Sequence, residues 1–236
     1  MRIFPSIVTT SGSRWEEKIK EINNLGIKEV ALFLTCADNE ERKEIYSSLL
    51  QSKIKSIPFV HLRSDMKLSE IEYFIKKYNT QIFNTHSERD FPIPKEWEKY
   101  KGVICIENTS SPLDEKELKR WGGLCLDFSH LENSQRINDG CYDINIKMVE
   151  KYPPRCNHIS AVKDKFILDE NEKVHYASHT LNNLNELDYL RKYPLSYFSE
   201  FCAIELENKI TDQLAAITYI NNLLKGRDNI IKEMGF

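Results

Sequence analysis

The sequence lacks several patterns that would place it quickly in a class of protein. No segment reaches the roughly 18 continuous apolar residues that a membrane span requires. The first residues include one arginine but an apolar run too short for a signal-peptide core, so we expect a cytoplasmic protein with no membrane partner. No Gly-x-Gly-x-x-Gly turn follows the first apolar run, which argues against an open dinucleotide-binding sheet.

Paired cysteines and an excess of positive charge are also missing. The six cysteines form no Cys-x-x-Cys pair, and Cys105, Cys125 and Cys202 lie inside apolar runs. We therefore expect reduced core thiols, not a disulfide framework. The net charge of −3 gives no overall positive field, so strong non-specific binding to nucleic acid is not expected.

The sequence does contain a regular alternation of short apolar runs and amphipathic stretches. The runs predict eight strands, at residues 2–8, 29–34, 56–61, 81–86, 102–107, 123–127, 156–160 and 201–206. The stretches after them predict eight helices, at residues 15–25, 40–51, 69–78, 95–100, 114–121, 142–152, 184–193 and 211–225. In the first helix, for example, Ile19, Ile22 and Leu25 share one face.

Strands separated by helices run parallel, because each crossover returns the chain to the same end of the sheet. Eight such units close naturally into a barrel, and no linker rich in Pro, Gly or Ser interrupts them. The sequence thus predicts an α/β protein, a single (β/α)₈ TIM barrel domain over residues 1–236. Such a barrel can also form a homo-oligomer through its outer helices.

Candidate metal ligands stand at the ends of the predicted strands, which form one rim in a barrel. Strands three to eight supply His61, His86, Glu107, Asp127, His158 and Glu205. His130 lies three residues after Asp127. His175 and His179, before the last strand, would share a face if that segment were helical.

The carboxylates in this set carry the strongest argument. Glu107 and Glu205 follow apolar residues, where an unpaired carboxylate is expensive to bury unless a cation neutralises it. A salt bridge to a lysine is the structural alternative. Glu207 alternates with Glu205 along the strand, so we expect it to point away from the pocket.

Mixed carboxylate and imidazole ligands suit Mn, Zn, Co or Fe better than magnesium alone, because imidazole is a poor ligand for a strongly hydrated ion. A serine hydrolase built from Ser129, His130 and a nearby Asp is a weaker alternative, because no Gly-x-Ser-x-Gly motif supports it.

Four short motifs, taken in order, resemble the xylose isomerase-like barrel superfamily. They are Ile-Glu107-Asn108-Thr, Leu-Asp127-Phe-Ser-His130, His158-Ile-Ser and the isolated Glu205. This superfamily includes sugar isomerases, sugar epimerases and AP endonucleases of the endonuclease IV type.

The epimerase branch implies one divalent metal held by Glu107, Asp127, His158 and Glu205. His130 would face a small-molecule carbohydrate substrate, and Glu107 and Glu205 would exchange a proton across an enediolate. The resemblance implies no organic cofactor. We therefore expect a metal-dependent sugar or sugar-phosphate isomerase or epimerase with Glu107, Glu205 and His130 as its catalytic residues.

The endonuclease branch implies a zinc cluster that also uses His61, His86, His130 and His179, with a nucleic acid substrate. Its Asp-x-His element is incomplete here, because Ala177 stands two residues before His179. A multinuclear zinc phosphodiesterase is therefore the alternative, and a barrel that has lost catalysis and serves as a binding module is a second one.

Overall fold

The computed structural model describes residues 1–10, 13–168 and 172–233. Nine parallel strands form one nearly closed barrel in the order β1-β11-β8-β7-β6-β5-β4-β3-β2. These strands are β1 (Arg2–Phe4), β2 (Ser6–Val8), β3 (Ala31–Phe33), β4 (Phe59–His61), β5 (Ile82–Thr85), β6 (Ile104–Glu107), β7 (Leu124–Asp127), β8 (Cys156–Ile159) and β11 (Phe201–Ile204). The predicted α/β barrel is confirmed, with every expected strand in place.

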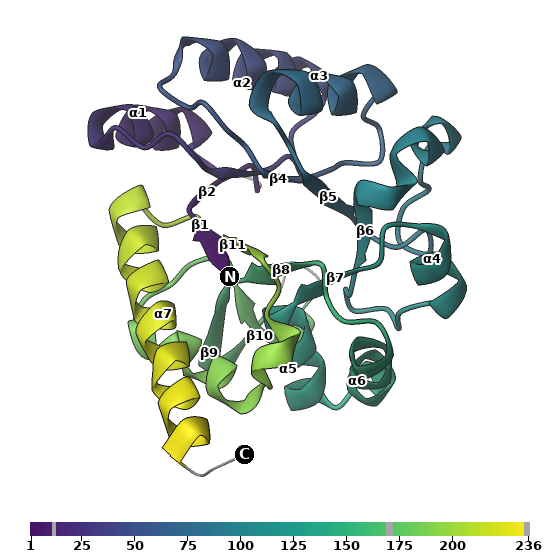
Figure 1. The fold of residues 1–236 in the computed structure, drawn as a ribbon, viewed down its shortest axis with the longest axis vertical. Coiled ribbons are helices and arrows are strands. Elements are labelled where there is room, and N and C mark those ends of the chain that lie inside the picture. Colours follow the sequence, from purple (N-terminus) through teal and green to yellow (C-terminus); the bar gives the residue numbers. More distant parts are fainter. Residues whose placement is uncertain (11–12, 169–171, 234–236) are drawn as a thin grey trace.

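Helices surround the barrel on its outside (Figure 1). The α-helices are α1 (Trp15–Leu25), α2 (Asn39–Gln51), α3 (Leu68–Tyr78), α4 (Glu115–Arg120), α5 (Phe128–Ile137), α6 (Cys141–Lys151) and α7 (Ile210–Glu233). Three segments are 3₁₀ helices, η1 (Lys95–Val103), η2 (Leu184–Lys192) and η3 (Leu195–Tyr197). Two stretches predicted as helices, at residues 95–100 and 184–193, are therefore of the tighter 3₁₀ type.

The first predicted strand is divided at Pro5, and this division forms the seam of the barrel. β1 pairs with β11, whereas β2 pairs with β3. At the seam the Ser6 hydroxyl donates to the Ile204 carbonyl. The buried Gln213 side chain of α7 accepts from Ser6 N at 2.7 Å and donates to Leu206 O at 2.8 Å. A side-chain amide thus takes the place of backbone ladder hydrogen bonds between Ser6 of β2 and the segment that follows β11.

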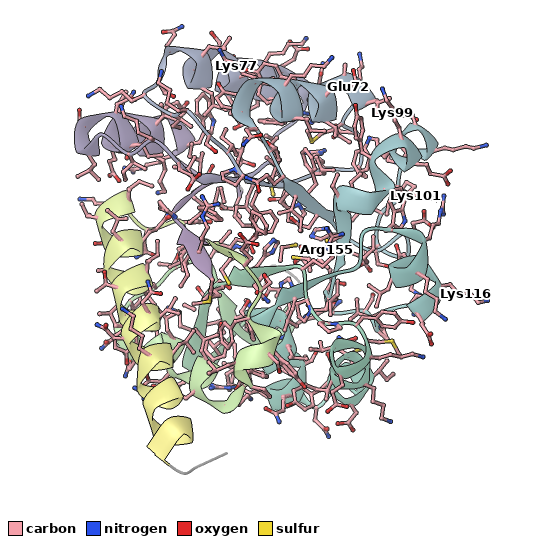
Figure 2. All side chains as sticks on the ribbon, in the orientation of Figure 1. Glu72, Lys77, Lys99, Lys101, Lys116 and Arg155 are labelled. Carbon is pink, nitrogen blue, oxygen red and sulfur yellow. The ribbon has the colours of Figure 1, made fainter. Side chains whose placement is uncertain are left out.

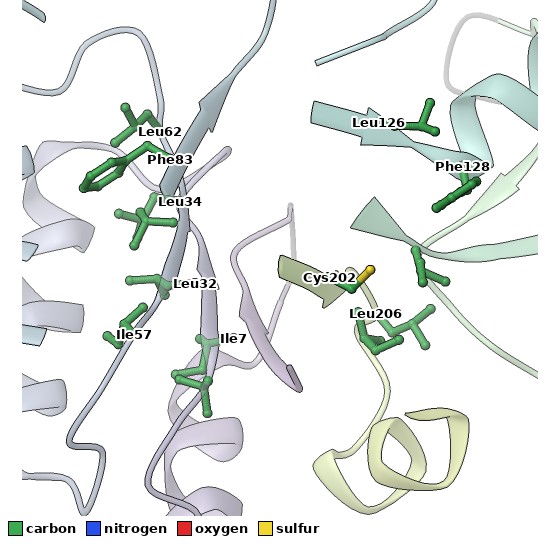
Figure 3. Packing of buried hydrophobic residues seen from close by; sticks show 14 of the residues in the cluster. Ile7, Leu32, Leu34, Ile57, Leu62, Phe83, Leu126, Phe128, Cys202 and Leu206 are labelled. Atoms are coloured by element: carbon green, nitrogen blue, oxygen red, sulfur yellow. The ribbon is translucent and has the colours of Figure 1, made fainter. Parts of the chain in front are cut away.

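Side chains alternate between the two faces of each barrel strand, as the pleat requires. Figure 3 shows Leu32, Leu34 and Phe83 on the face toward the helical layer, where they belong to the larger hydrophobic cluster. A smaller cluster fills the inside of the barrel and consists of Phe4, Val8, Ala31, Phe33, Phe59, Ile82, Cys105, Cys125, Cys156 and Ala203. The predicted core thiols Cys105, Cys125 and Cys202 are buried and free, as expected.

Two elements of the structure are absent from the sequence-based expectation. Helix α5 begins directly after β7, where we expected a turn before the helix at 142–152. Strands β9 (Ala161–Leu168) and β10 (Val174–Ser178) form an antiparallel hairpin after β8. The hairpin escaped notice because its strands are largely exposed and lack a clear apolar alternation.

Charged side chains cover the outer helical layer. Figure 2 shows Glu72 and Lys77 of α3, Lys99 of η1 and Lys116 of α4 at the periphery. Lys99 Nζ lies 2.6 Å from Glu72 Oε1, and this ion pair links η1 to α3. In the described part of the chain, no helix is long and apolar enough to cross a membrane.

Candidate metal centre and barrel mouth

The candidate site lies inside the barrel next to the inner hydrophobic cluster, two residues further along each strand. On six neighbouring strands, a cluster residue is followed two positions later by a buried polar residue that shares its face. These polar residues, from β4 to β11 around the barrel, are His61, Asn84, Glu107, Asp127, His158 and Glu205. The alternation of the strands therefore brings them together as one layer.

Glu107 is the centre of this layer. Its Oε2 lies 2.9 Å from His61 Nε2 and 3.4 Å from His158 Nδ1, and its Oε1 lies 3.5 Å from His130 Nδ1. Asn84 Nδ2 also donates to Oε2, at 2.7 Å. With its side chain only 2% exposed, Glu107 interacts with protein groups and scarcely with solvent.

His158 connects Glu107 to two further carboxylates. Its Nδ1 lies 3.5 Å from Glu205 Oε2 and 3.8 Å from Asp127 Oδ2. Three overlapping sets have ligand atoms within 4.8 Å of one another: His61, Glu107 and His158; Glu107, Asp127 and His130; and Asp127, His158 and Glu205. The structure thus brings six of the predicted ligands into one cluster.

Helix α5 explains how Asp127 and His130 come to lie together. Asp127 is the N-cap of this helix, and its Oδ1 accepts from His130 N at 2.8 Å and from Ser129 Oγ at 2.7 Å. The same carboxylate directs its other oxygen toward His130 Nδ1, at 3.7 Å. An Asp-x-x-His spacing is therefore the spacing of a helix cap and its third residue.

This arrangement contradicts the serine hydrolase alternative. Ser129 is buried, donates to Asp127 and accepts from Ser160 Oγ at 2.6 Å. His130 Nδ1 is 3.1 Å from the Asn108 carbonyl oxygen. Ser129 is therefore held within the hydrogen bonds that orient Asp127, without the imidazole partner that a nucleophilic serine requires.

The carboxylates strongly perturb the histidines. Burial disfavours the charged form of His158, but Glu107, Glu205 and Asp127 outweigh it and raise its pKa to about 9. Burial also opposes the charging of His130, yet Asp127 and Glu107 raise its pKa to about 10. For Glu107, burial works against ionisation, but His158, His61 and His130 together hold its pKa well below the usual range.

The cluster also contains buried polar atoms without hydrogen-bond partners among the described residues. His158 Nε2 is of this kind, whereas His158 Nδ1 and Asp127 Oδ2 make only the ion-pair contacts given above, without hydrogen-bond geometry. Because such atoms are expensive to bury, an explanation is required, and a bound cation is a common one. Carboxylate oxygens and imidazole nitrogens are also the donor set that first-row divalent metals accept, so the residues fit such an ion.

The other two predicted ligands, His86 and His179, lie at the edge of this cluster. The His86 ring packs edge-on against His61, 4.8 Å between centroids, and burial lowers its pKa to about 4. His179 Nε2 lies 3.7 Å from Glu205 Oε1. Neither belongs to a described set of three ligand atoms close enough to share an ion.

A cavity of about 800 Å³ opens above the cluster. His86, His130 and His179 line it, and so do His175 and Glu207. His175 lies on strand β10, so it does not share a helix with His179. The expectation that Glu207 points away from the pocket is wrong, because side chains two positions apart in an extended chain lie on the same face, and Glu207 follows Glu205 by two positions and lines the cavity.

The sequence reasoning gave no role to two residues that position the cluster, although Asn108 belongs to one of the motifs that carry the resemblance. Asn84, whose amide holds Glu107, was passed over in favour of the more reactive His86 two residues later. Asn108 bridges β6 to β7, since its amide donates to Asp127 O at 2.9 Å and its Oδ1 accepts from Asp127 N at 2.7 Å. The position of Asn84, two residues after Ile82, was the available signal.

No family model matches the sequence, and no curated protein matches it either. Among solved structures, a xylose isomerase domain protein from Planctomyces limnophilus aligns with a TM-score of 0.50 and 12% identity, over 96% of this chain and 97% of that one. A D-tagatose 3-epimerase-like protein aligns with a TM-score of 0.44 and 14% identity, over 98% and 100% of the two chains.

A xylose isomerase-like TIM barrel protein from Mycobacterium smegmatis, in complex with magnesium, aligns with a TM-score of 0.38 and 11% identity, over 94% and 97% of the two chains. At these identities a likeness concerns the fold alone, and the first of the three alignments carries it. The chain has the fold of the xylose isomerase-like barrels, as the residues at its strand ends predict.

Proposed function

We propose that this chain is a divalent-metal-dependent isomerase or epimerase of a sugar or sugar phosphate. One observation carries the proposal: the carboxylates of Glu107 and Glu205 approach the same nitrogen of buried His158, at 3.4 and 3.5 Å. Isomerisation and epimerisation both remove a proton from a carbon of the sugar and return it to that carbon or its neighbour. Two carboxylates at one buried centre supply the base and the acid for this transfer.

The ion would be held by Glu107, Asp127, His158 and Glu205. The buried atoms of His158 and Asp127 that make no hydrogen bond support this assignment, as does the excess of carboxylates over neutral donors. The chemistry that a bound cation supplies is polarisation of the carbonyl and hydroxyl groups of the substrate.

The remaining work falls to the side chains of the chain itself. Glu107 and Glu205 accept and return the proton through carboxylate oxygens, and Asn84 keeps Glu107 in place by donating to its Oε2 at 2.7 Å. His130, which lines the cavity, would orient a substrate hydroxyl. Phe33 and Phe59 pack against His158, with ring centroids 4.8 and 5.3 Å away, and exclude water from the far side of the centre.

A multinuclear phosphodiesterase of the endonuclease IV type is the second candidate function. The observation that favours it is the pair of extra imidazoles, His61 and His86, beside Glu107. Ala177 argues against a phosphodiesterase, because the endonuclease branch has an aspartate at this position, two residues before the histidine. In this chain Ala177 lines the cavity. One ion therefore accounts for the described cluster better than three.

Metal content per chain is the first test. Elemental mass spectrometry of protein purified without a histidine tag or chelator should find about one Mn, Zn, Co or Fe ion. Two or three zinc ions would favour the phosphodiesterase. A protein that neither contains nor takes up metal would contradict both and leave the binding module.

Proton exchange tests the chemistry itself. The metal-loaded protein, incubated in D₂O with a panel of ketoses and their phosphates, should introduce deuterium next to the carbonyl, as followed by NMR. Glu107→Gln and Glu205→Gln should each lower the rate by about 10²- to 10⁴-fold. Cleavage of abasic DNA or a bis-aryl phosphodiester without exchange would instead identify the second candidate, and full exchange in either variant would refute the assigned roles.

A further inference from the structure

The two carboxylate oxygens of Asp127 have different surroundings. Oδ1 accepts hydrogen bonds from Ser129 Oγ at 2.7 Å and from His130 N at 2.8 Å, and these two bonds occupy both lone pairs of this oxygen. Oδ2 makes no hydrogen bond among the described residues and lies 3.7 and 3.8 Å from ring nitrogens of His130 and His158. One oxygen of this carboxylate is therefore open to an ion, and the other is not.

The directions of the hydrogen bonds behind Oδ1 follow from the chemistry of the partners. A carboxylate that binds a cation is ionised and only accepts, so Ser129 gives its single hydroxyl hydrogen to Asp127. Ser129 Oγ also lies 2.6 Å from Ser160 Oγ and has no hydrogen left for this contact. Ser160 is therefore the donor, and its bond holds the Ser129 hydroxyl in the orientation that serves Asp127.

The fold fixes both serines. Ser129 is the second residue of α5, and Ser160 is the single residue between β8 and β9. The carbonyl of Ser160 accepts from Tyr189 OH of η2 at 2.9 Å. Both serines are only 1% exposed, so water does not compete for their hydrogen bonds.

Glu205 provides a comparison within the same cluster. Its Oε2 lies 3.5 Å from His158 Nδ1, and its Oε1 lies 3.7 Å from His179 Nε2. Neither oxygen accepts a hydrogen bond in the part of the chain that the structure describes. Glu205 is therefore free to offer one oxygen or two, whereas Asp127 is limited to one.

We propose that Ser129 and Ser160 are positioning residues that restrict Asp127 to one oxygen toward the ion and thereby favour Zn²⁺ over Mn²⁺. The inference rests on the metal dependence of the proposed function and names what sets the ion selectivity of that site. A carboxylate that binds through both oxygens supplies one ligand more than a carboxylate that binds through one. Zinc in proteins is mostly four-coordinate, whereas manganese takes octahedral sites with more oxygen ligands.

The ratio of Zn²⁺ to Mn²⁺ affinity, measured by competition with a fluorescent chelator, is the first test. Ser129→Ala should lower Zn²⁺ affinity about tenfold, as is typical when a partner of a ligand is deleted. Mn²⁺ affinity should stay the same or rise, because Oδ1 becomes available as a further ligand. Ser160→Ala should shift the ratio in the same direction by a smaller factor, and Ser160→Thr, which keeps the hydroxyl, should retain the wild-type ratio.

Ser134→Ala is the matched control. Ser134 is a buried serine of the same helix, and its hydroxyl donates to another aspartate, Asp139, at 3.0 Å. Its removal should leave the ratio of the two affinities unchanged, even if it lowers the Tm as much as Ser129→Ala does.

The visible absorption of the Co²⁺-loaded protein is the second test. Because this absorption weakens as the coordination number rises, it should be weaker in Ser129→Ala than in wild type and unchanged in Ser134→Ala. An unchanged spectrum in Ser129→Ala, or equal losses of Zn²⁺ and Mn²⁺ affinity, would overturn the inference. Neither measurement needs turnover, so a protein that discriminates between the ions but exchanges no proton would contradict the isomerase assignment alone. A wild-type protein that binds neither ion would overturn both.

Discussion

Two buried clusters of charged residues in this molecule differ in how completely their polar atoms are paired. Between α2 and α3, Arg42 is 1% exposed and donates to Glu70 at 2.9 Å, to Asp65 at 3.0 Å and to the Ala37 carbonyl at 2.9 Å. Glu70 in turn accepts from Tyr46 OH and Lys67 N, each at 2.7 Å. These bonds satisfy the pair from within the protein.

The cluster at the barrel mouth has the opposite character. Three carboxylates meet there, and buried atoms of His158 and Asp127 have no hydrogen bond among the described residues. The proposed ion site requires this difference, because charge that holds elements together is paired internally, whereas charge that receives a ligand leaves donor atoms open. Stability and ion binding should therefore separate in variants of the two clusters.

The largest effect is expected from Glu70→Gln, which leaves the buried Arg42 guanidinium with the largely exposed Asp65 as its remaining charged partner. We expect the free energy of unfolding at pH 7 to fall by about 3 kcal/mol or more. Glu72→Gln on the same helix removes one partner of a solvent-screened ion pair with Lys99 and should change it far less in the same urea titration. Equal losses of unfolding free energy in the two variants would show that the buried ion pair stabilises the protein no more than the exposed one.

The effect of Glu70→Gln should also depend on pH. Burial tends to raise the pKa of Glu70, but hydrogen bonds from Arg42, Tyr46 and Lys67 N prevail and lower it. A carboxyl whose pKa is lower when folded stabilises the protein above its unfolded pKa of about 4.3, and this stabilisation disappears as the pH falls through the folded value. The gap between wild type and variant, measured by urea unfolding, should therefore shrink below about pH 4.

Asp127→Asn should lower metal affinity and leave stability almost unchanged, which is the reverse of the effect expected for Glu70→Gln. The amide retains an oxygen for Ser129 and His130 N, so stability without metal should change by less than about 1 kcal/mol. Metal affinity should fall on the order of 100-fold, about 2.7 kcal/mol, in competition with a fluorescent chelator. Asp188→Asn on η2, where the side chain is 44% exposed, is the matched control. Unchanged affinity in Asp127→Asn would remove this carboxylate from the proposed ligands.

Gln213→Ala should lower stability and leave metal affinity almost unchanged, as we expect for changes in the cluster around Arg42 and Glu70. Its amide makes hydrogen bonds to Ser6 and Leu206 at the seam, so its removal leaves buried backbone groups without partners. We expect a loss of about 2 kcal/mol in unfolding free energy and a metal affinity within a few-fold of wild type. A large loss of metal affinity would show that the seam and the mouth are coupled.

The smallest effect is expected from Asn84→Ala, which removes the donor that positions Glu107. Metal affinity should fall about tenfold, as is typical when a partner of a ligand is deleted. Asn84→Asp offers a sharper comparison, because a carboxylate there would oppose Glu107 directly. An Asn84→Ala variant with wild-type affinity would show that Glu107 needs no positioning by this amide.

Much of the fold could be predicted because its signals are local. Apolar runs such as that at Ile104–Glu107 and helical faces such as that of α1 are visible within a dozen residues. The sequence did not predict helix α5, because this helix has few apolar residues. Its buried face is defined by packing against β10 and α6. The break at Pro5 was missed because its partner, Gln213, lies 207 residues from Ser6 in the sequence.

The sequence by itself determined the alternation of strand and helix and, through the two-residue repeat of each strand, which polar side chains share the inner face with the core. Only the tertiary structure decided which of these residues meet, because closure of the barrel sets the distances among Glu107, His158 and Glu205. It also brought the Asn84 amide to Glu107 of the next strand and gave Glu207 a place in the cavity lining. Those outcomes depend on where each strand ends and on what packs across the mouth, and neither is encoded within any single segment.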